Sequence, residues 1–119
     1  MLRGVRGATT VENDDKEEIM TAAEELLKLL VAENKIDSED IGAIIFSSTP
    51  DINSAFPAAG VRRIGFTDVP LFGAQEIDCP TGVKKCIRVL ILTNTELKQK
   101  EIKHIYLKGA AALRPEFKR

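Results

Sequence analysis

The clearest pattern along the chain is a one-sided stripe of apolar residues between residues 19 and 31. Its members recur at every third or fourth position: Ile19, Ala22, Ala23, Leu26, Leu27, Leu30 and Val31. This spacing is typical of an amphipathic α-helix that buries one face. We expect Asn13 or Asp14 to cap its start, because short polar side chains accept hydrogen bonds from the first free amides, and we expect it to end near Asn34.

Five further segments are rich in apolar residues and are predicted to be β-strands. They cover residues 2–11, 41–48, 69–77, 83–95 and 102–107. A short helix is predicted over 55–64 and a helical turn over 109–113. This order predicts an α+β fold, a mixed β-sheet with one long helix packed on one face. Because so short a chain has nothing else to cover the second face, we expect it to self-associate.

Length and charge narrow the class of protein. We expect the 119 residues to form one domain, 1–119, with a flexible tail from about residue 115. The 17 basic residues are balanced by 18 acidic ones, which argues against nucleic acid as a partner. No stretch approaches the roughly 18 apolar residues of a membrane span, so no membrane is expected. Cys79 and Cys86 are predicted to be free thiols in a cytoplasmic protein with no metal and no cofactor.

One charged residue interrupts the most apolar segment of the chain. Arg88 lies within Cys-Ile-Arg-Val-Leu-Ile-Leu, residues 86–92, which is typical of a buried strand. An arginine keeps its charge, so a buried guanidinium requires a carboxylate, a phosphate or an anionic ligand. This segment alone supports a structural ion pair and a ligand-facing arginine equally.

The sequence offers few residues that could act as a catalytic base or nucleophile, and no nucleotide-binding motif. His104 is the single histidine, so a Ser-His-Asp or Cys-His arrangement would depend on it, and its predicted strand setting favours a structural role. No phosphate-binding or dinucleotide-binding glycine motif is present. What remains is a set of arginines with Glu76 and Tyr106 as polar partners. That inventory suits recognition of a polycarboxylate, and a reaction that needs electrostatics and conformational control without a nucleophile.

Several segments, taken together, match a known family in order and spacing. They are residues 3–11, 56–58, 75–77, 84–89, 104–107 and 113–115. On these the chain, from residue 1 to about 116, closely resembles the monofunctional, trimeric chorismate mutases of the Bacillus type. The resemblance implies a pseudo-α/β-barrel homotrimer with active sites in clefts between neighbouring subunits. It also implies the Claisen rearrangement of chorismate to prephenate, a step toward phenylalanine and tyrosine.

The resemblance implies a role for four residues in catalysis. Arg88 corresponds to the arginine beside the breaking ether oxygen. Arg6 and Tyr106 correspond to the groups that hold a substrate carboxylate. Glu76 corresponds to the carboxylate that receives the ring hydroxyl. A pericyclic reaction needs neither a base nor a nucleophile, which agrees with the residue inventory.

The resemblance also implies which residues line the substrate cleft. From the neighbouring subunit these are Phe56, Ala58 and, near the mouth, Arg62. Leu71 and Phe72 would form the wall beside Glu76, and Leu113 and Arg114 would close the site from the C-terminal tail. Two positions depart from the family: Gly73 stands where a small polar side chain is usual, and Ala59 where some relatives have lysine. Both departures predict weaker substrate binding rather than loss of the reaction.

A second interpretation remains open. Small trimers of the same architecture bind anionic metabolites or process reactive enamines at subunit clefts, and they also use an interface arginine. Fold alone does not settle function. The presence of Arg6, Glu76, Arg88 and Tyr106 together favours the mutase.

Overall fold

The computed structural model describes residues 1–117. Its central element is a five-stranded mixed β-sheet. Strands and helices follow one another along the chain as β1 (Leu2–Thr10), α1 (Lys16–Glu33), β2 (Ile41–Ser48), α2 (Pro57–Arg62), β3 (Leu71–Gln75), β4 (Cys86–Asn94) and β5 (Ile105–Tyr106). Short 3-10 turns are Ser38–Asp40, Gln99–Glu101, Lys108–Ala112 and Pro115–Phe117. Of the tail predicted to be flexible, residues 118 and 119 lie outside the described part.

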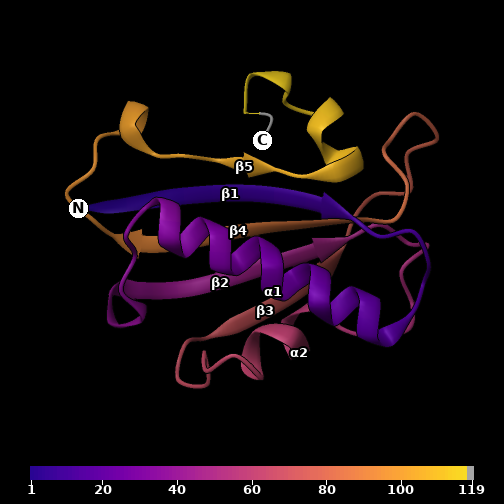
Figure 1. Cartoon of the computed structure of the whole chain (residues 1–119), viewed down its shortest axis with the longest axis horizontal. Coiled ribbons are helices and arrows are strands. Elements are labelled where there is room, and N and C mark those ends of the chain that lie inside the picture. Colours follow the sequence, from indigo (N-terminus) through magenta and orange to yellow (C-terminus); the bar gives the residue numbers. More distant parts are fainter. Residues whose placement is uncertain (118–119) are drawn as a thin grey trace.

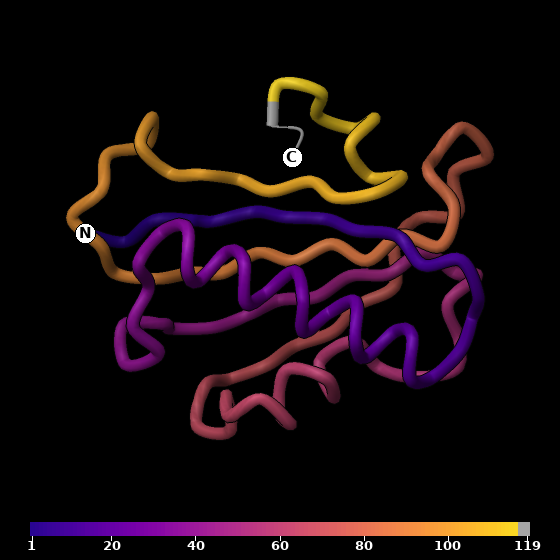
Figure 2. Tube along the Cα trace, viewed as in Figure 1, coloured from indigo at the N-terminus to yellow at the C-terminus, as the bar shows by residue number. Residues whose placement is uncertain are grey.

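The strands lie side by side in the order β3-β2-β4-β1-β5. β4 pairs antiparallel with both β1 and β2, whereas β3 and β5 join the edges in parallel. Helix α1 crosses one face of the sheet, α2 lies near β3, and the C-terminal segment lies beyond β5 (Figures 1 and 2). The predicted α+β fold with a mixed sheet and one long helix is therefore confirmed.

Helix α1 begins one residue later than the predicted cap. Asp15 is the N-cap, and its side chain accepts a hydrogen bond of 3.0 Å from the Glu18 N–H. The Glu18 carboxylate reaches back to the N–H of Glu12, 2.8 Å away, so the first turn is closed from both sides. Asp14 instead accepts hydrogen bonds from the backbone N–H groups of residues 53 and 54. The prediction of Asn13 or Asp14 was wrong because Asp14 binds a distant loop.

The core lies between α1 and the sheet. Alternate residues of β1 and β4 point toward the helix, and they are buried, as Val5, Ile87 and Ile91 show. At Gly7 a Cβ would come within 2.9 Å of Leu30 Cδ1, so only glycine lets the helix approach β1 this closely. Because side chains alternate along a strand, the residues between these buried positions point to the opposite face of the sheet.

Within residues 1–117 no α-helix covers the opposite face of the sheet, and the C-terminal segment packs against one part of it, around Ala8 (Figure 1). Strand pairing aligns Arg6 of β1 with Leu90 of β4, and Leu90 with Ile45 of β2. Ile45 is aligned in turn with Phe72 of β3, whose side chain is exposed. A row of mainly apolar residues therefore crosses this uncovered face.

The last predicted strand is shorter than expected. Pairing with β1 involves only Ile105 and Tyr106, against the predicted 102–107. The strand is interrupted on its N-terminal side because the Arg6 N–H donates to the ring Nδ1 of His104, not to a backbone carbonyl. His104 therefore lies just outside the strand, and its ring takes the place of a sheet hydrogen bond.

Candidate active site

Arg88 is not buried, contrary to the prediction from its apolar neighbours. In β4 its neighbours Ile87 and Val89 face the helix, so Arg88 points to the uncovered face, where its side chain is 44% exposed. The segment is apolar throughout because Leu90 and Leu92 also lie on that face, where they are partly buried. The guanidinium is therefore accessible to a ligand.

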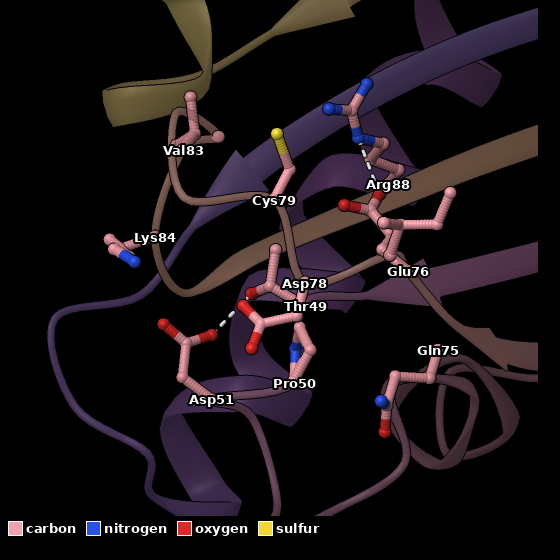
Figure 3. Close-up of a pocket in the computed structure, with 12 residues that line it drawn as sticks. Thr49, Pro50, Asp51, Gln75, Glu76, Asp78, Cys79, Val83, Lys84 and Arg88 are labelled. Carbon is pink, nitrogen blue, oxygen red and sulfur yellow. Dashed lines mark hydrogen bonds and ion pairs between the residues drawn. The ribbon is translucent and has the colours of Figure 1, made fainter.

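Arg88 forms an ion pair with Glu76, the residue after β3. Arg88 Nε lies 2.5 Å from Glu76 Oε1, and Ser47 Oγ donates to the same oxygen at 3.0 Å. The two terminal nitrogens of Arg88 point away from the carboxylate (Figure 3). The structure therefore shows an acidic partner for the arginine, and the arginine also faces an open space, where contact with a ligand stays a prediction.

The ion pair lies in an open pocket of about 710 Å³. Its walls come from the turn after β2, the end of β3, the loop that follows, and the start of β4 (Figure 3). The lining residues are Thr49, Pro50, Asp51, Gln75, Glu76, Ile77, Asp78, Cys79, Gly82, Val83, Lys84 and Arg88. Of the predicted site residues, the pocket brings together only Glu76 and Arg88.

Cys79, which lines the pocket, and Cys86, at the start of β4, differ in chemistry. The Cys79 thiol is exposed, and a hydrogen-bonding contact with Thr81 Oγ1 lowers its pKa. The Cys86 thiol is buried, and burial raises its pKa to about 11. Cys86 therefore stays protonated at neutral pH, which makes it a packing residue and a poor nucleophile.

Arg6 and Tyr106 lie on the same face as Arg88 but nearer the other edge of the sheet. Ala8 is aligned with Arg88 on one side and with Tyr106 on the other, so the three belong to one row across the sheet. Arg6 is exposed, whereas Tyr106 is buried.

His104, which accepts the hydrogen bond from Arg6, is uncharged. Burial, followed by the positive charges of Arg6 and Arg114, lowers the pKa of His104, so its ring is neutral at pH 7.

The C-terminal segment packs onto this row. A small cluster at its base consists of Ala8, Cys86, Tyr106 and Ala110, with Val83 and Leu113 packed against it. Arg114 Nε contacts Glu116 Oε1 at 2.5 Å. The predicted closing residue Leu113 therefore packs against the cluster that contains Cys86, the first residue of β4, and Arg114 is the next residue along the chain.

The remaining predicted residues lie elsewhere in the chain. Phe56, which is 80% exposed, precedes α2, and Ala58 and Arg62 lie within it, outside the pocket. Leu71 and Phe72 belong to β3. Gly73 is exposed, and a Cβ there would meet nothing within 4 Å. Among residues 1–117, no atom lies close enough to take the place of a side chain at this position.

Sequence reasoning missed three residues at the pocket. Ser47 contacts Glu76, and Thr49 and Asp51 hold the start of β4. The signal for Ser47 was its strand alternation, which places it opposite Arg88. Thr-Pro-Asp, residues 49–51, gave only the signature of a turn.

Metal-ion clusters and membrane-spanning helices are absent from residues 1–117. No group of three or more His, Cys, Asp or Glu side chains there could hold a metal ion. No helix within that range has the length and apolar character to cross a membrane.

Comparison with known proteins gives one consistent family. The chain matches the family of type I chorismate mutases over residues 2–117. It is 44% identical over 117 residues to the chorismate mutase AroH of Bacillus subtilis, covering 98% of this chain and 92% of that protein. It is 46% identical over 117 residues to AroH of Thermus thermophilus, covering 98% and 96%. The solved structure of a chorismate mutase from Clostridium thermocellum has a TM-score of 0.90 at 42% identity, covering 92% of this chain and 98% of that one.

Proposed function

Since the chain belongs to the type I chorismate mutase family and is a chorismate mutase, an isomerase, we propose that chorismate rearranges to prephenate beside Arg88 and Glu76. The observation that carries the assignment of the site is the ion pair of these two residues in an open pocket on the uncovered face. The alternative, a binding or enamine-processing trimer of the same architecture, is not favoured by the comparisons.

The rearrangement breaks the ether C–O bond of chorismate while a C–C bond forms, so the side chain moves within the molecule, no proton is transferred and no atom is gained or lost. Two contributions from the protein follow. The site must hold the substrate in a compact, chair-like form, which lowers the entropic part of the barrier. It must also stabilise the negative charge that grows on the ether oxygen, which a fixed cation does most effectively.

We assign these contributions to particular atoms. Arg88 uses Nε to bind Glu76, so its terminal nitrogens are directed at the ether oxygen. Within residues 1–117, Arg88 and Ser47 both contact Oε1 of the Glu76 carboxylate, and we assign Oε2 as the acceptor for the ring hydroxyl. Arg6 and Tyr106 hold a substrate carboxylate on the side of this face that β1 and β5 form, and Leu113 and Arg114 cover the site.

The charges of the pocket support a contribution from a second copy. Within residues 1–117, the charged residues that line it are the acidic Asp51, Glu76 and Asp78 and the basic Arg88 and Lys84. Chorismate carries two carboxylates, so this lining alone would repel it. Additional cations are needed, and Arg6 and Arg114 of the same chain supply part of them.

We infer a homotrimer whose clefts are completed by Phe56, Ala58 and Arg62 of a neighbouring copy. The row of Leu90, Ile45 and Phe72 on the uncovered face supports this, because exposed apolar patches are typical of subunit interfaces. A cytoplasmic location is also proposed, since both cysteines are free thiols, as is usual in a reducing compartment.

The experiment follows the loss of chorismate by ultraviolet absorbance, with the solution mass measured by light scattering. The wild-type chain is expected to be an active trimer, whereas Arg88→Ala and Arg62→Ala are each expected to be trimeric and nearly inactive. When the two variants are unfolded together and refolded, part of the activity returns, because some clefts receive Arg88 from one chain and Arg62 from another. An active wild-type monomer, or no recovery on mixing, would contradict the shared site.

A further inference from the structure

Lys85, three residues before Arg88, has a backbone conformation that residues other than glycine rarely adopt. Its φ is 44°, in the left-handed region that costs a non-glycine residue of order 1 kcal/mol. Both of its backbone polar groups are held. The Lys85 N–H donates to the Asp51 carboxylate, 3.2 Å from Oδ1 and 3.0 Å from Oδ2, and the Lys85 carbonyl accepts from the Val11 N–H at 3.0 Å.

Thr49 holds the next residue in the same way. Its N–H donates to the Cys86 carbonyl at 3.0 Å, and its Oγ1 accepts from the Cys86 N–H at 2.9 Å. The Thr49 hydroxyl donates in turn to Asp51 Oδ1 at 2.5 Å (Figure 3). Asp51 and Thr49 together therefore fix the two residues with which the pocket loop enters β4.

The position of Asp51 is electrostatically unfavourable for the proposed substrate. Burial works against ionisation of Asp51, but the hydrogen bonds from Thr49 and the Lys85 N–H outweigh it and lower the pKa of the carboxyl. A carboxylate is thus present in a pocket that must accept a dianion, where it repels the ligand. We infer that the hydrogen bonds of Asp51 to Lys85 and Thr49 have a structural role that offsets this repulsion.

We propose that Asp51 is a positioning residue for the rearrangement: by holding Lys85 in the left-handed conformation, it fixes the direction in which β4 leaves the loop and hence the place of the Arg88 guanidinium. The inference rests on the role of Arg88 proposed above. Strained residues at a functional site persist only where the surroundings over-determine them, as the contacts at both ends of Lys85 do. Asp51 acts through Arg88 and needs no contact with chorismate.

The first test compares Asp51→Ala with Asp37→Ala. Asp37 also accepts a backbone hydrogen bond, from the Glu39 N–H at 3.0 Å, but at a turn that does not line the pocket. Asp51→Ala is expected to lower kcat by about tenfold or more, since small displacements of a catalytic group have effects of this size. KM should change less, because Arg88 acts mainly in the transition state. Asp37→Ala is expected to leave kcat within about twofold of wild type.

The second test uses Lys85→Gly to separate positioning from general loss of stability. Glycine adopts a positive φ without steric cost. Lys85→Gly alone is expected to keep kcat near the wild-type value, and added to Asp51→Ala it should recover a large part of the lost kcat. Measurement of the melting temperature of all variants shows whether kcat follows the hydrogen bond or the stability.

Three results would overturn the proposal: a wild-type kcat in Asp51→Ala, the same loss of kcat in Asp37→Ala, or no recovery on adding Lys85→Gly. If Asp51→Ala does not fold, Asp51→Asn is used. Its amide oxygen still accepts from Lys85, so an intermediate kcat and faster amide hydrogen exchange at residues 85–88 support the proposal, and wild-type values of both oppose it. Failure of the proposed function is distinguished by the wild-type chain itself, which would then not consume chorismate.

Discussion

Ser47 and Arg88 lie opposite each other across the pairing of β2 with β4, and both bind the same oxygen of Glu76. The carboxylate is thereby held by a neutral donor and a cation from two different strands. Because Glu76 follows a third strand, β3, the site is formed only when these three strands have the correct register. Its geometry is a property of the sheet more than of any loop.

This relationship predicts a moderate effect for Ser47→Ala. Loss of one neutral hydrogen bond to Glu76 is expected to cost about 1 kcal/mol, or about fivefold in kcat/KM, while Arg88 still holds the carboxylate. Ser48→Ala is the matched control, because Ser48 alternates to the other side of β2 and should leave kcat/KM unchanged. Steady-state kinetics on chorismate measure both variants. Equal losses in the two would show that the hydroxyl of Ser47 has no specific role.

The elements of the fold could be predicted because they depend on local patterns. Helix α1 follows from the spacing of its apolar residues, which is repeated over four turns. The order of strands along the chain follows from their apolar content. The cap was misplaced by one residue, because Asp14 and Asp15 are equally good caps until the loop at 53–54 binds one of them.

The site was less predictable because it depends on contacts between distant residues. Arg88 was expected to be buried, since an apolar run does not reveal which of its two faces a helix covers. The contact of Asp51 with Lys85 spans 34 positions, and nothing near either residue indicates the other. That Arg88 and Glu76 lie in one site followed only from the family resemblance, and not from the residues around either of them.

His104 supports a prediction about pH. Its Nδ1 accepts from the Arg6 N–H, which only the neutral ring can do, and burial with the charges of Arg6 and Arg114 lowers its pKa. In the unfolded chain the His104 ring therefore takes up a proton more readily than in the folded chain. Its contribution to stability is complete above about pH 6.5 and is lost as the pH falls below that value. Melting temperatures measured between pH 8 and pH 5 should show this loss.

The same residue is expected to have little effect on the reaction. In His104→Asn the amide oxygen takes the place of Nδ1, so activity should be largely retained and nearly flat across neutral pH. The pH-dependent loss of stability should become smaller, because asparagine does not titrate. A bell-shaped activity profile that disappears in His104→Asn would instead show acid–base chemistry.

Thr9 predicts a change in stability without a change in activity. Its hydroxyl is buried between β1 and the core, and it has no hydrogen-bond partner within residues 1–117. Thr9→Val is nearly isosteric and removes the cost of the unpaired group, so the free energy of unfolding should rise by about 1 kcal/mol. Thr93→Val is the control: Thr93 is equally buried but donates to the Asp40 carbonyl at 3.2 Å, so its replacement should destabilise the chain. Denaturation followed by circular dichroism at one protein concentration measures both.

The sharpest prediction separates the charge of Arg88 from its size. Arg88→Ala should abolish activity and leave the chain folded, because the side chain faces an open pocket and not the core. Arg88→Lys should restore activity in part at most, since a point charge replaces a planar group that binds Glu76 and the substrate at once.

Arg88→citrulline keeps the planar shape of arginine, removes its positive charge and replaces one terminal nitrogen donor by an oxygen acceptor. If that charge stabilises the ether oxygen as the bond breaks, kcat should fall by on the order of 10²-fold or more, as for other lost oxyanion contacts. The affinity for chorismate should change much less, because the oxygen becomes strongly negative only in the transition state. Normal turnover by the citrulline protein would mean that positioning of the substrate drives the reaction alone. Loss of folding would mean that the pair with Glu76 is structural, which its exposure in the pocket argues against.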